Sequence, residues 1–277
     1  MGSCIRKHPL LSYYIITFVI SWGGFVLAAG PGGLSGSDWQ TAPTFPFMVG
    51  AMLAGPTVAG LLMTGLTAGR SGLRELGSRL VRWRVGTQWY AFALLPAPAL
   101  SLIALLALGL TSPLFTAESK AAVLVPGITA GLTTIFEEIG WTGFAVPRFR
   151  LRRSILGTGL IVGILWGVWH LLQQVFISGT YAEDIPLPLY MAVAVFNTVA
   201  GLTAYRVLLV WVYDRTGSLL VTTLMHASLT ACNIFIFRPE ATGLPFVTFG
   251  LLFTALQWLL VAVVAVLDRG RLTRRPA

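Results

Sequence analysis

Eight apolar runs, each long enough to cross a membrane, are the feature that most constrains the fold of this chain. About 20 helical residues span the ~30 Å hydrocarbon core of a bilayer, and the backbone polar groups there must be satisfied within the protein. Hydrophobic residues make up 56% of the sequence and charged residues only 10%, compared with about 25% charged residues in soluble proteins. We therefore predict an all-α, polytopic transmembrane bundle that forms one integral membrane domain over residues 1–277. The predicted spans are 10–29, 45–68, 88–110, 121–146, 155–177, 187–212, 217–236 and 244–267.

Basic residues alternate between the segments that connect these spans. One set of loops and termini carries sixteen arginines and lysines, and the opposite set carries only two. By the positive-inside rule, both termini are predicted to be cytoplasmic, in a multi-pass protein of the cell inner (plasma) membrane. This distribution explains the net charge of +9 without a nucleic-acid partner, and the excess of arginine over lysine favours a bacterial source. The larger set is Arg6, Lys7, Arg70, Arg74, Arg79, Arg82, Arg84, Arg148, Arg150, Arg152, Arg153, Arg215, Arg269, Arg271, Arg274 and Arg275; the smaller set is Lys120 and Arg238.

Two local features modify the picture of straight spans joined by plain loops. Residues 71–87 are rich in arginine with apolar residues interleaved, a pattern typical of an amphipathic helix on anionic lipid. An ordinary basic loop fits this segment equally well, so both interpretations stay open. Prolines within spans are tolerated where neighbouring groups satisfy the carbonyls that they leave free, and four are found here: Pro56, Pro96, Pro98 and Pro126.

Two adjacent glutamates, Glu137 and Glu138, lie in the fourth apolar run, with no basic residue after them before Arg148. A charged side chain at the bilayer centre costs about 3 kcal/mol on insertion scales, so an acid at this depth indicates a functional site. The other strongly functional side chains at comparable depth are His170 and His226. We therefore expect these residues to form one site.

The depths of these residues agree with such a site. Glu137 and His226 each lie 11 residues from the nearest basic residue of the predicted cytoplasmic side, or roughly 16 Å along a helix. His170 lies 17 residues from that side, roughly 25 Å if its helix began at once, and Gly157 and Gly159 indicate a later start or a tilt. All three side chains can therefore share one level in the membrane.

The spacing of polar residues also predicts which side chains share a helix face. Residues four apart lie on the same face, which pairs Glu138 with Thr142 and Trp166 with His170. On the seventh span, a polar stripe at i, i+4 and i+7 is expected to face the bundle interior. It consists of His226, Thr230 and Asn233.

Such a set of residues can support hydrolysis. A buried carboxylate beside an imidazole can take a proton from water, and a second histidine with a neutral donor can stabilise an oxyanion. A zinc site from Glu137, His170 and His226 is possible, although no i, i+4 pair of ligands is present to begin it. A polar network that merely locks the helices together is another interpretation. A transporter is disfavoured because corresponding halves of the chain lack paired broken helices.

The motifs around these residues resemble those of the CPBP family, which contains the CAAX proteases and bacteriocin-processing proteins. The sequence Glu-Glu-Ile-Gly-Trp-Thr-Gly-Phe from Glu137 is similar to the family's Glu-Glu-x-x-x-Arg motif, and Trp166-Gly-Val-Trp-His170 to its second motif, an aromatic residue four before histidine. Leu-Met-His226-Ala-Ser resembles the third region, usually His-x-x-x-Asn. The resemblance covers residues 118–236, the expected catalytic core. It implies that Glu137 and His170 activate water, that His226 and its i+4 neighbour hold the oxyanion, and that Glu138 is structural.

Two positions depart from the family pattern. Thr142 replaces the motif arginine and Thr230 replaces the asparagine, where Asn233 one turn further on could substitute. Glu138 therefore lacks the usual ion partner on its own helix. We hypothesise that Arg206, the sole arginine within a span, supplies this charge from the sixth span; the alternative is that its side chain snorkels to the interface.

The sequence thus predicts an intramembrane glutamic endopeptidase that needs neither metal nor other cofactor. Its expected partners are a peptide or protein substrate in the membrane and the lipid bilayer itself. The runner-up is a catalytically silent membrane scaffold or bacteriocin self-immunity protein, and the threonines at positions 142 and 230 favour it.

Overall fold

A computed structural model describes residues 2–30, 42–177 and 185–274 of the chain. It confirms the all-α prediction and contains eight helical segments long and apolar enough to cross a membrane, each overlapping one predicted span. Seven spans are built from the helices α2 (Pro9–Ala29), α3 (Phe45–Leu80), α7 (Lys120–Gly140), α9 (Ile155–Ile177), α10 (Leu187–Thr216), α11 (Leu219–Thr230) and α12 (Gly243–Leu267). The remaining span combines α4 (Thr87–Leu94) with α5 (Pro96–Ala107), and the short helices are α1 (Gly2–Lys7), α6 (Pro113–Thr116), α8 (Val146–Arg150) and η5 (Arg271–Thr273).

Two spans change winding immediately after their motif residues. After α7 the chain continues as the π-helix η2 (Trp141–Ala145), and after α11 as the π-helix η4 (Ala231–Ile236). Short π-helical turns within α-helices are found frequently at functional sites. Both turns follow the helices that carry the glutamates and the seventh-span histidine.

The helix α3 is broken at Gly69, which has φ 63° and ψ −155°. A positive φ of this kind is easily adopted only by glycine, and the break coincides with the predicted end of the second span. Residues 70–80 continue as a basic helix, whereas residues 82–86 are non-helical. The segment 71–87 is thus neither wholly helix nor wholly loop, and its contact with lipid stays a prediction.

Prolines shape two of the spans, and hydroxyl groups from neighbouring helices compensate for them. Pro56 cannot donate to the carbonyl of Met52, and the Ser21 hydroxyl donates to that oxygen instead, at 2.7 Å. Pro98 likewise leaves the Leu94 carbonyl free, and Ser228 donates to it at 2.9 Å. The third span, predicted as one helix, is divided between α4 and α5 at Pro96.

Glycines allow the helices around the site to approach closely. On α9, Gly159, Gly163 and Gly167 form a stripe, and a Cβ on any of them would come within 3 Å of the α10 backbone. Small residues at such spacing are typical of tightly packed membrane helices. This stripe brings the motif residues of α9 against α10.

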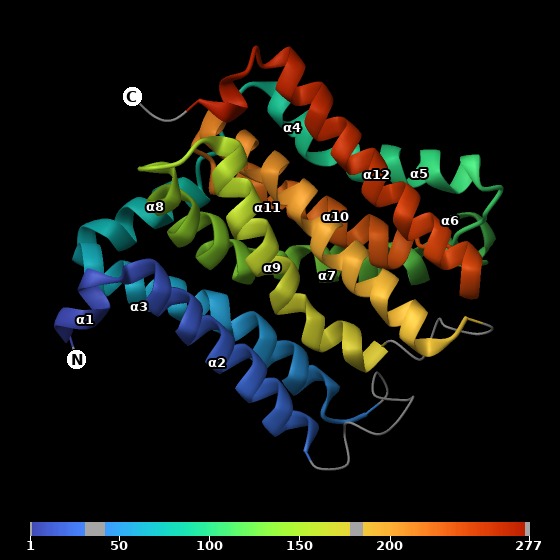
Figure 1. Cartoon of the computed structure of the whole chain (residues 1–277), viewed down its shortest axis with the longest axis horizontal. Coiled ribbons are helices and arrows are strands. Elements are labelled where there is room, and N and C mark those ends of the chain that lie inside the picture. Colours follow the sequence, from blue (N-terminus) through green and yellow to red (C-terminus); the bar gives the residue numbers. More distant parts are fainter. Residues whose placement is uncertain (1, 31–41, 178–184, 275–277) are drawn as a thin grey trace.

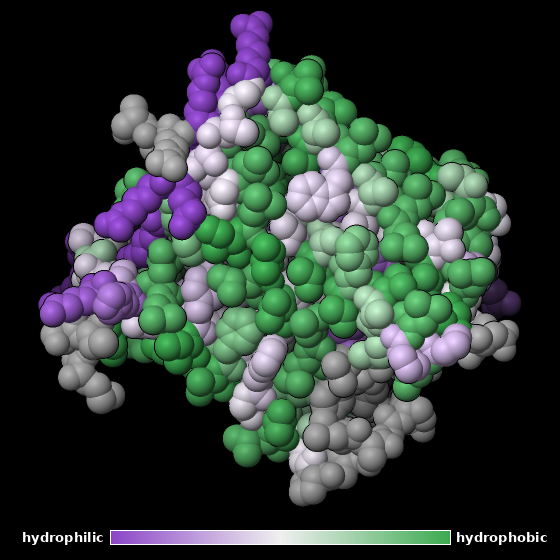
Figure 2. Space-filling model, viewed as in Figure 1, coloured by the Kyte–Doolittle hydropathy of each residue, from purple (hydrophilic) through white to green (hydrophobic). Residues whose placement is uncertain are grey.

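The charged side chains gather at one end of the bundle. Figure 1 places α1, α8 and both ends of the chain on the same side of the view, and Figure 2 shows hydrophilic residues concentrated there while apolar residues cover most of the visible face. Ion pairs connect separate segments of the chain at this end, including Arg150 with Asp214 at 2.7 Å and Arg215 with Asp268. The grouping follows the charge alternation in the sequence, and the assignment of this end to the cytoplasm stays a prediction.

Candidate active site

The two adjacent glutamates lie near the end of α7 and point to different partners. Glu138 is fully buried, and Glu137 is 7% exposed. The preceding residue is fixed to α3, because the Thr57 hydroxyl donates to the Phe136 carbonyl. Because successive helical residues point about 100° apart, the two carboxylates cannot share one direct partner.

Glu138 forms the cross-helix ion pair that the sequence analysis expected. Nη1 of Arg206 lies 2.9 Å from Oε1 and 3.0 Å from Oε2 of Glu138. The Thr142 hydroxyl also donates to Oε2, and Arg206 Nη1 donates to that hydroxyl at 3.2 Å. The Arg206 side chain is fully buried, so the snorkelling alternative is wrong.

A second partner of Glu138 was missed from the sequence. Nδ1 of His226 lies 2.9 Å from Oε1 of Glu138. A carboxylate that is paired with arginine accepts at this contact, so His226 donates through Nδ1 and its Nε2 is the ring atom left to meet a substrate. The depth agreement between the two helices was the available signal, but it did not show which glutamate faces the histidine.

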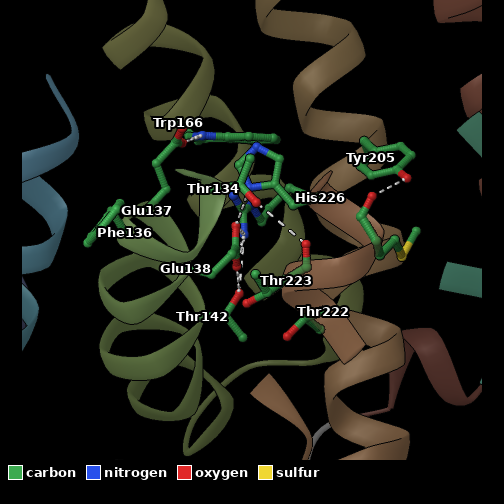
Figure 3. A network of polar contacts seen from close by, with 12 residues as sticks. Thr134, Phe136, Glu137, Glu138, Thr142, Trp166, Tyr205, Thr222, Thr223 and His226 are labelled. Carbon is green, nitrogen blue, oxygen red and sulfur yellow. Dashed lines mark hydrogen bonds and ion pairs between the residues drawn. The ribbon is translucent and has the colours of Figure 1, made fainter. Parts of the chain in front are cut away.

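Trp166 connects the remaining groups (Figure 3). Its indole Nε1 donates to Oε2 of Glu137 at 2.8 Å, and its ring lies 4.0 Å from the guanidinium carbon of Arg206. The rings of His170 and His226 meet it edge-on, with centroids 5.4 Å and 4.8 Å away. The aromatic motif residue is therefore a donor to one glutamate as well as a packing surface.

His170 is held by its own helix, as the i, i+4 spacing predicted. Its Nδ1 lies 2.9 Å from the Trp166 carbonyl oxygen. A carbonyl can only accept a hydrogen bond, so Nδ1 carries the proton and Nε2 has a free lone pair in the neutral ring. The side chain is partly exposed, and within the described part of the chain it forms no hydrogen bond with Glu137.

The seventh-span stripe was predicted to face the interior, and only its first member is buried. His226 is 3% exposed, whereas Thr230 and Asn233 are partly exposed and form no side-chain hydrogen bond with any described residue. Thr230 is the last residue of α11, and Asn233 lies in η4, beyond the change from α to π winding. Their role in holding an oxyanion stays a prediction.

The position of His226 is fixed by contacts along α11. The Tyr205 hydroxyl donates to the Met225 carbonyl at 2.9 Å. A Cβ at Gly131 would come within 3 Å of the Ala227 carbonyl, so this glycine lets α7 and α11 approach at the level of the histidine. No three His, Cys, Asp or Glu side chains among the described residues converge to hold a metal ion.

Fold and site together define a polytopic helical membrane protein with a buried centre built from glutamate, histidine, arginine and tryptophan side chains on separate spans. Residues 118–232, which include all of the motif residues from Glu137 to His226, match the family described as Type II CAAX prenyl endopeptidase Rce1-like. This match confirms, for residues 118–232, the resemblance to the CPBP family seen in the sequence.

A curated relative matches over a shorter stretch. CAAX prenyl protease 2 of Methanococcus maripaludis is 33% identical over 54 residues, which is 20% of this chain and 20% of the relative. The chain thus aligns with about a fifth of that protein's length. The boundaries 118–236 of the predicted catalytic core stay a prediction.

Proposed function

We propose that this protein is an intramembrane endopeptidase that uses Glu137 as the base for water. The observation that carries the proposal is the unequal partnering of the two glutamates. Glu138 is bound by Arg206, Thr142 and His226, whereas Glu137 accepts one hydrogen bond from an uncharged indole. Within the described residues its other oxygen has no partner, so this carboxylate is the one available to take a proton.

The chemistry can be written with the groups in place. Glu137, with the free Nε2 of His170 beside the same tryptophan, removes a proton from water as its oxygen attacks the peptide carbonyl carbon. In this step His226 carries a proton on both ring nitrogens and donates Nε2–H to the resulting oxyanion, while Glu138 accepts from Nδ1–H and balances the imidazolium charge. When the C–N bond breaks, the proton held by Glu137 passes to the leaving amine. Water is consumed, and no other reactant is needed.

The substrate we propose is a peptide or protein segment associated with the membrane. The site is enclosed by helices that are apolar outside, which favours a chain that already lies at the bilayer. The family description and the name of the archaeal relative both refer to prenylated CAAX substrates. That class is the first to test, with unmodified peptides of the same sequence as the comparison.

The test compares peptide termini in membranes from cells that express wild type, Glu137→Gln or Glu75→Gln at matched levels. Glu75 is an exposed residue paired with Arg79 on the basic helix, so its substitution controls for loss of an acid. We expect new termini with wild type and Glu75→Gln, and a loss of at least ~100-fold with Glu137→Gln, as for removal of a general base.

Identical termini in all three strains would contradict the protease. The other candidate, a silent scaffold or self-immunity protein, is favoured by the two departures from the family motifs, Thr142 and Thr230. That function predicts a host phenotype that survives Glu137→Gln.

A further inference from the structure

Arg206 occupies an unusual position for a charged residue. Its side chain is fully buried within a membrane span, where an unpaired charge is expensive. Every polar contact that it makes with the described residues runs through Nη1, while Nε and Nη2 have no partner there. The guanidinium is therefore held by one edge and by the face of Trp166.

Two partners of this guanidinium, Glu138 and Trp166, each bind one of the groups proposed to act on the substrate. Glu138, bound by Nη1, in turn binds Nδ1 of His226. Trp166, whose ring lies against the guanidinium, donates to Glu137. A cation over an indole face is attracted by the negative face of the ring, and more strongly when both groups are desolvated. The Arg206 side chain on α10 thus contacts both Glu138, which binds the proposed oxyanion donor, and Trp166, which binds the proposed base.

We infer that Arg206 is a positioning residue that sets the geometry of both the base and the oxyanion donor, and that its charge, more than its place on α10, is what the site requires. This inference rests on the proposed function. The second half follows from Thr142, whose hydroxyl lies 3.2 Å from Nη1 of Arg206. A cation supplied from position 142 of α7 would reach the same carboxylate.

The first experiment separates positioning from folding by comparing Arg206→Lys with Arg206→Met in detergent-solubilised, full-length protein. Lysine keeps the charge but has no planar face for Trp166. We expect Arg206→Lys to fold with a Tm near that of wild type and to lower kcat by about 10- to 100-fold, the range for loss of an orienting partner, with KM little changed. Arg206→Met should lose both stability and kcat. Equal kcat in wild type and Arg206→Lys would overturn the positioning role.

The second experiment moves the charge. Thr142→Arg alone places two cations in one buried site, and Arg206→Met alone leaves Glu138 without a counter-ion, so each should lower Tm and activity. We expect the double variant Thr142→Arg/Arg206→Met to be more stable and more active than either single variant. The matched control is Thr142→Gln/Arg206→Met, which has a polar side chain of similar reach but no charge and should not recover.

The two proposals can fail separately. If wild-type protein cleaves no substrate, the proposed function is contradicted. The Tm values of the four variants in the second experiment would still test whether Glu138 needs a cation beside it. Wild-type cleavage combined with additive losses in the double variant would leave the protease standing and overturn the inference about Arg206. Recovery by the glutamine control equal to that by arginine would do the same, because it would show that filling space is sufficient.

Discussion

Glu137 and Glu138 are neighbours in the sequence, but their side chains have very different surroundings. Glu138 is enclosed by a cation, a hydroxyl and an imidazole, which stabilise a fixed negative charge. Among the residues that the structure describes, Glu137 accepts a hydrogen bond only from an indole N–H, which suits the proton exchange proposed for it. The chemical difference between two identical side chains therefore arises from the helices that face them.

Trp166→Phe should separate the two contacts of this tryptophan. Phenylalanine retains an aromatic face for Arg206 but removes the Nε1 donor to Glu137. We expect kcat to fall about tenfold, equivalent to ~1.4 kcal/mol of transition-state stabilisation, with a Tm close to wild type. Trp141→Phe is the control, because the Trp141 indole nitrogen is buried without a described partner. An equal loss of kcat in both variants would show that the hydrogen bond to Glu137 has no special role.

At this scale the sequence predicted the participants but not all of their contacts. The pairing of Glu138 with Arg206, hypothesised because Arg206 is the sole arginine within a predicted span, is present in the structure. Depth along a helix can also be counted from the loops. The rotation of one helix against another cannot be counted in this way. For that reason the Glu138–His226 contact was missed, and the indole of Trp166 was not expected to bind Glu137.

Among the elements, helices α2 and α3 illustrate how a proline is accommodated within a span. Pro56 frees the Met52 carbonyl, and Ser21 of α2 donates to it. The hydroxyl can approach because the neighbouring residue is Gly55, where a Cβ would overlap the Ser21 oxygen. Gly55 and Ser21 together thus keep the Met52 carbonyl hydrogen-bonded although Pro56 cannot donate to it.

Ser21→Ala should therefore destabilise the protein by about 1–3 kcal/mol, the cost of leaving a buried acceptor unpaired. In a Pro56→Ala background the backbone N–H of residue 56 can bond to Met52, so the same serine substitution should cost much less. Thermal unfolding in detergent measures both effects, with the exposed Ser78→Ala as control. A serine effect of the same size in both backgrounds would argue against this compensation.

The extents of the spans were predictable because apolar length is set by bilayer thickness, and all eight predictions overlap the observed segments. Local winding was less predictable. The π turns η2 and η4 depend on packing against other helices, and no residue in them marks the change. The break at Gly69 and the division at Pro96 lie at residues that permit a bend without requiring one.

For the molecule as a whole, the eight spans place both termini on one side, and the basic residues predict that this side is cytoplasmic. Cysteine labelling in right-side-out membrane vesicles tests this directly. In a background of Cys4→Ser and Cys232→Ser, an impermeant maleimide should label Glu118→Cys in sealed vesicles and Arg152→Cys only after they are opened. Both positions are exposed, so the reverse order of labelling would invert the predicted topology.

The cross-helix ion pair has a consequence for how the protein is made. Arg206 follows Glu138 by 68 residues, so translation at 5–20 residues per second delivers the cation roughly 3 to 14 seconds after the acid. During this interval the nascent chain has its glutamates but lacks the side chain that arranges them. The proposed hydrolytic centre is then complete only when the seventh span adds His226, 88 residues after Glu138, so a ribosome that stalls earlier would leave an inert fragment in the membrane.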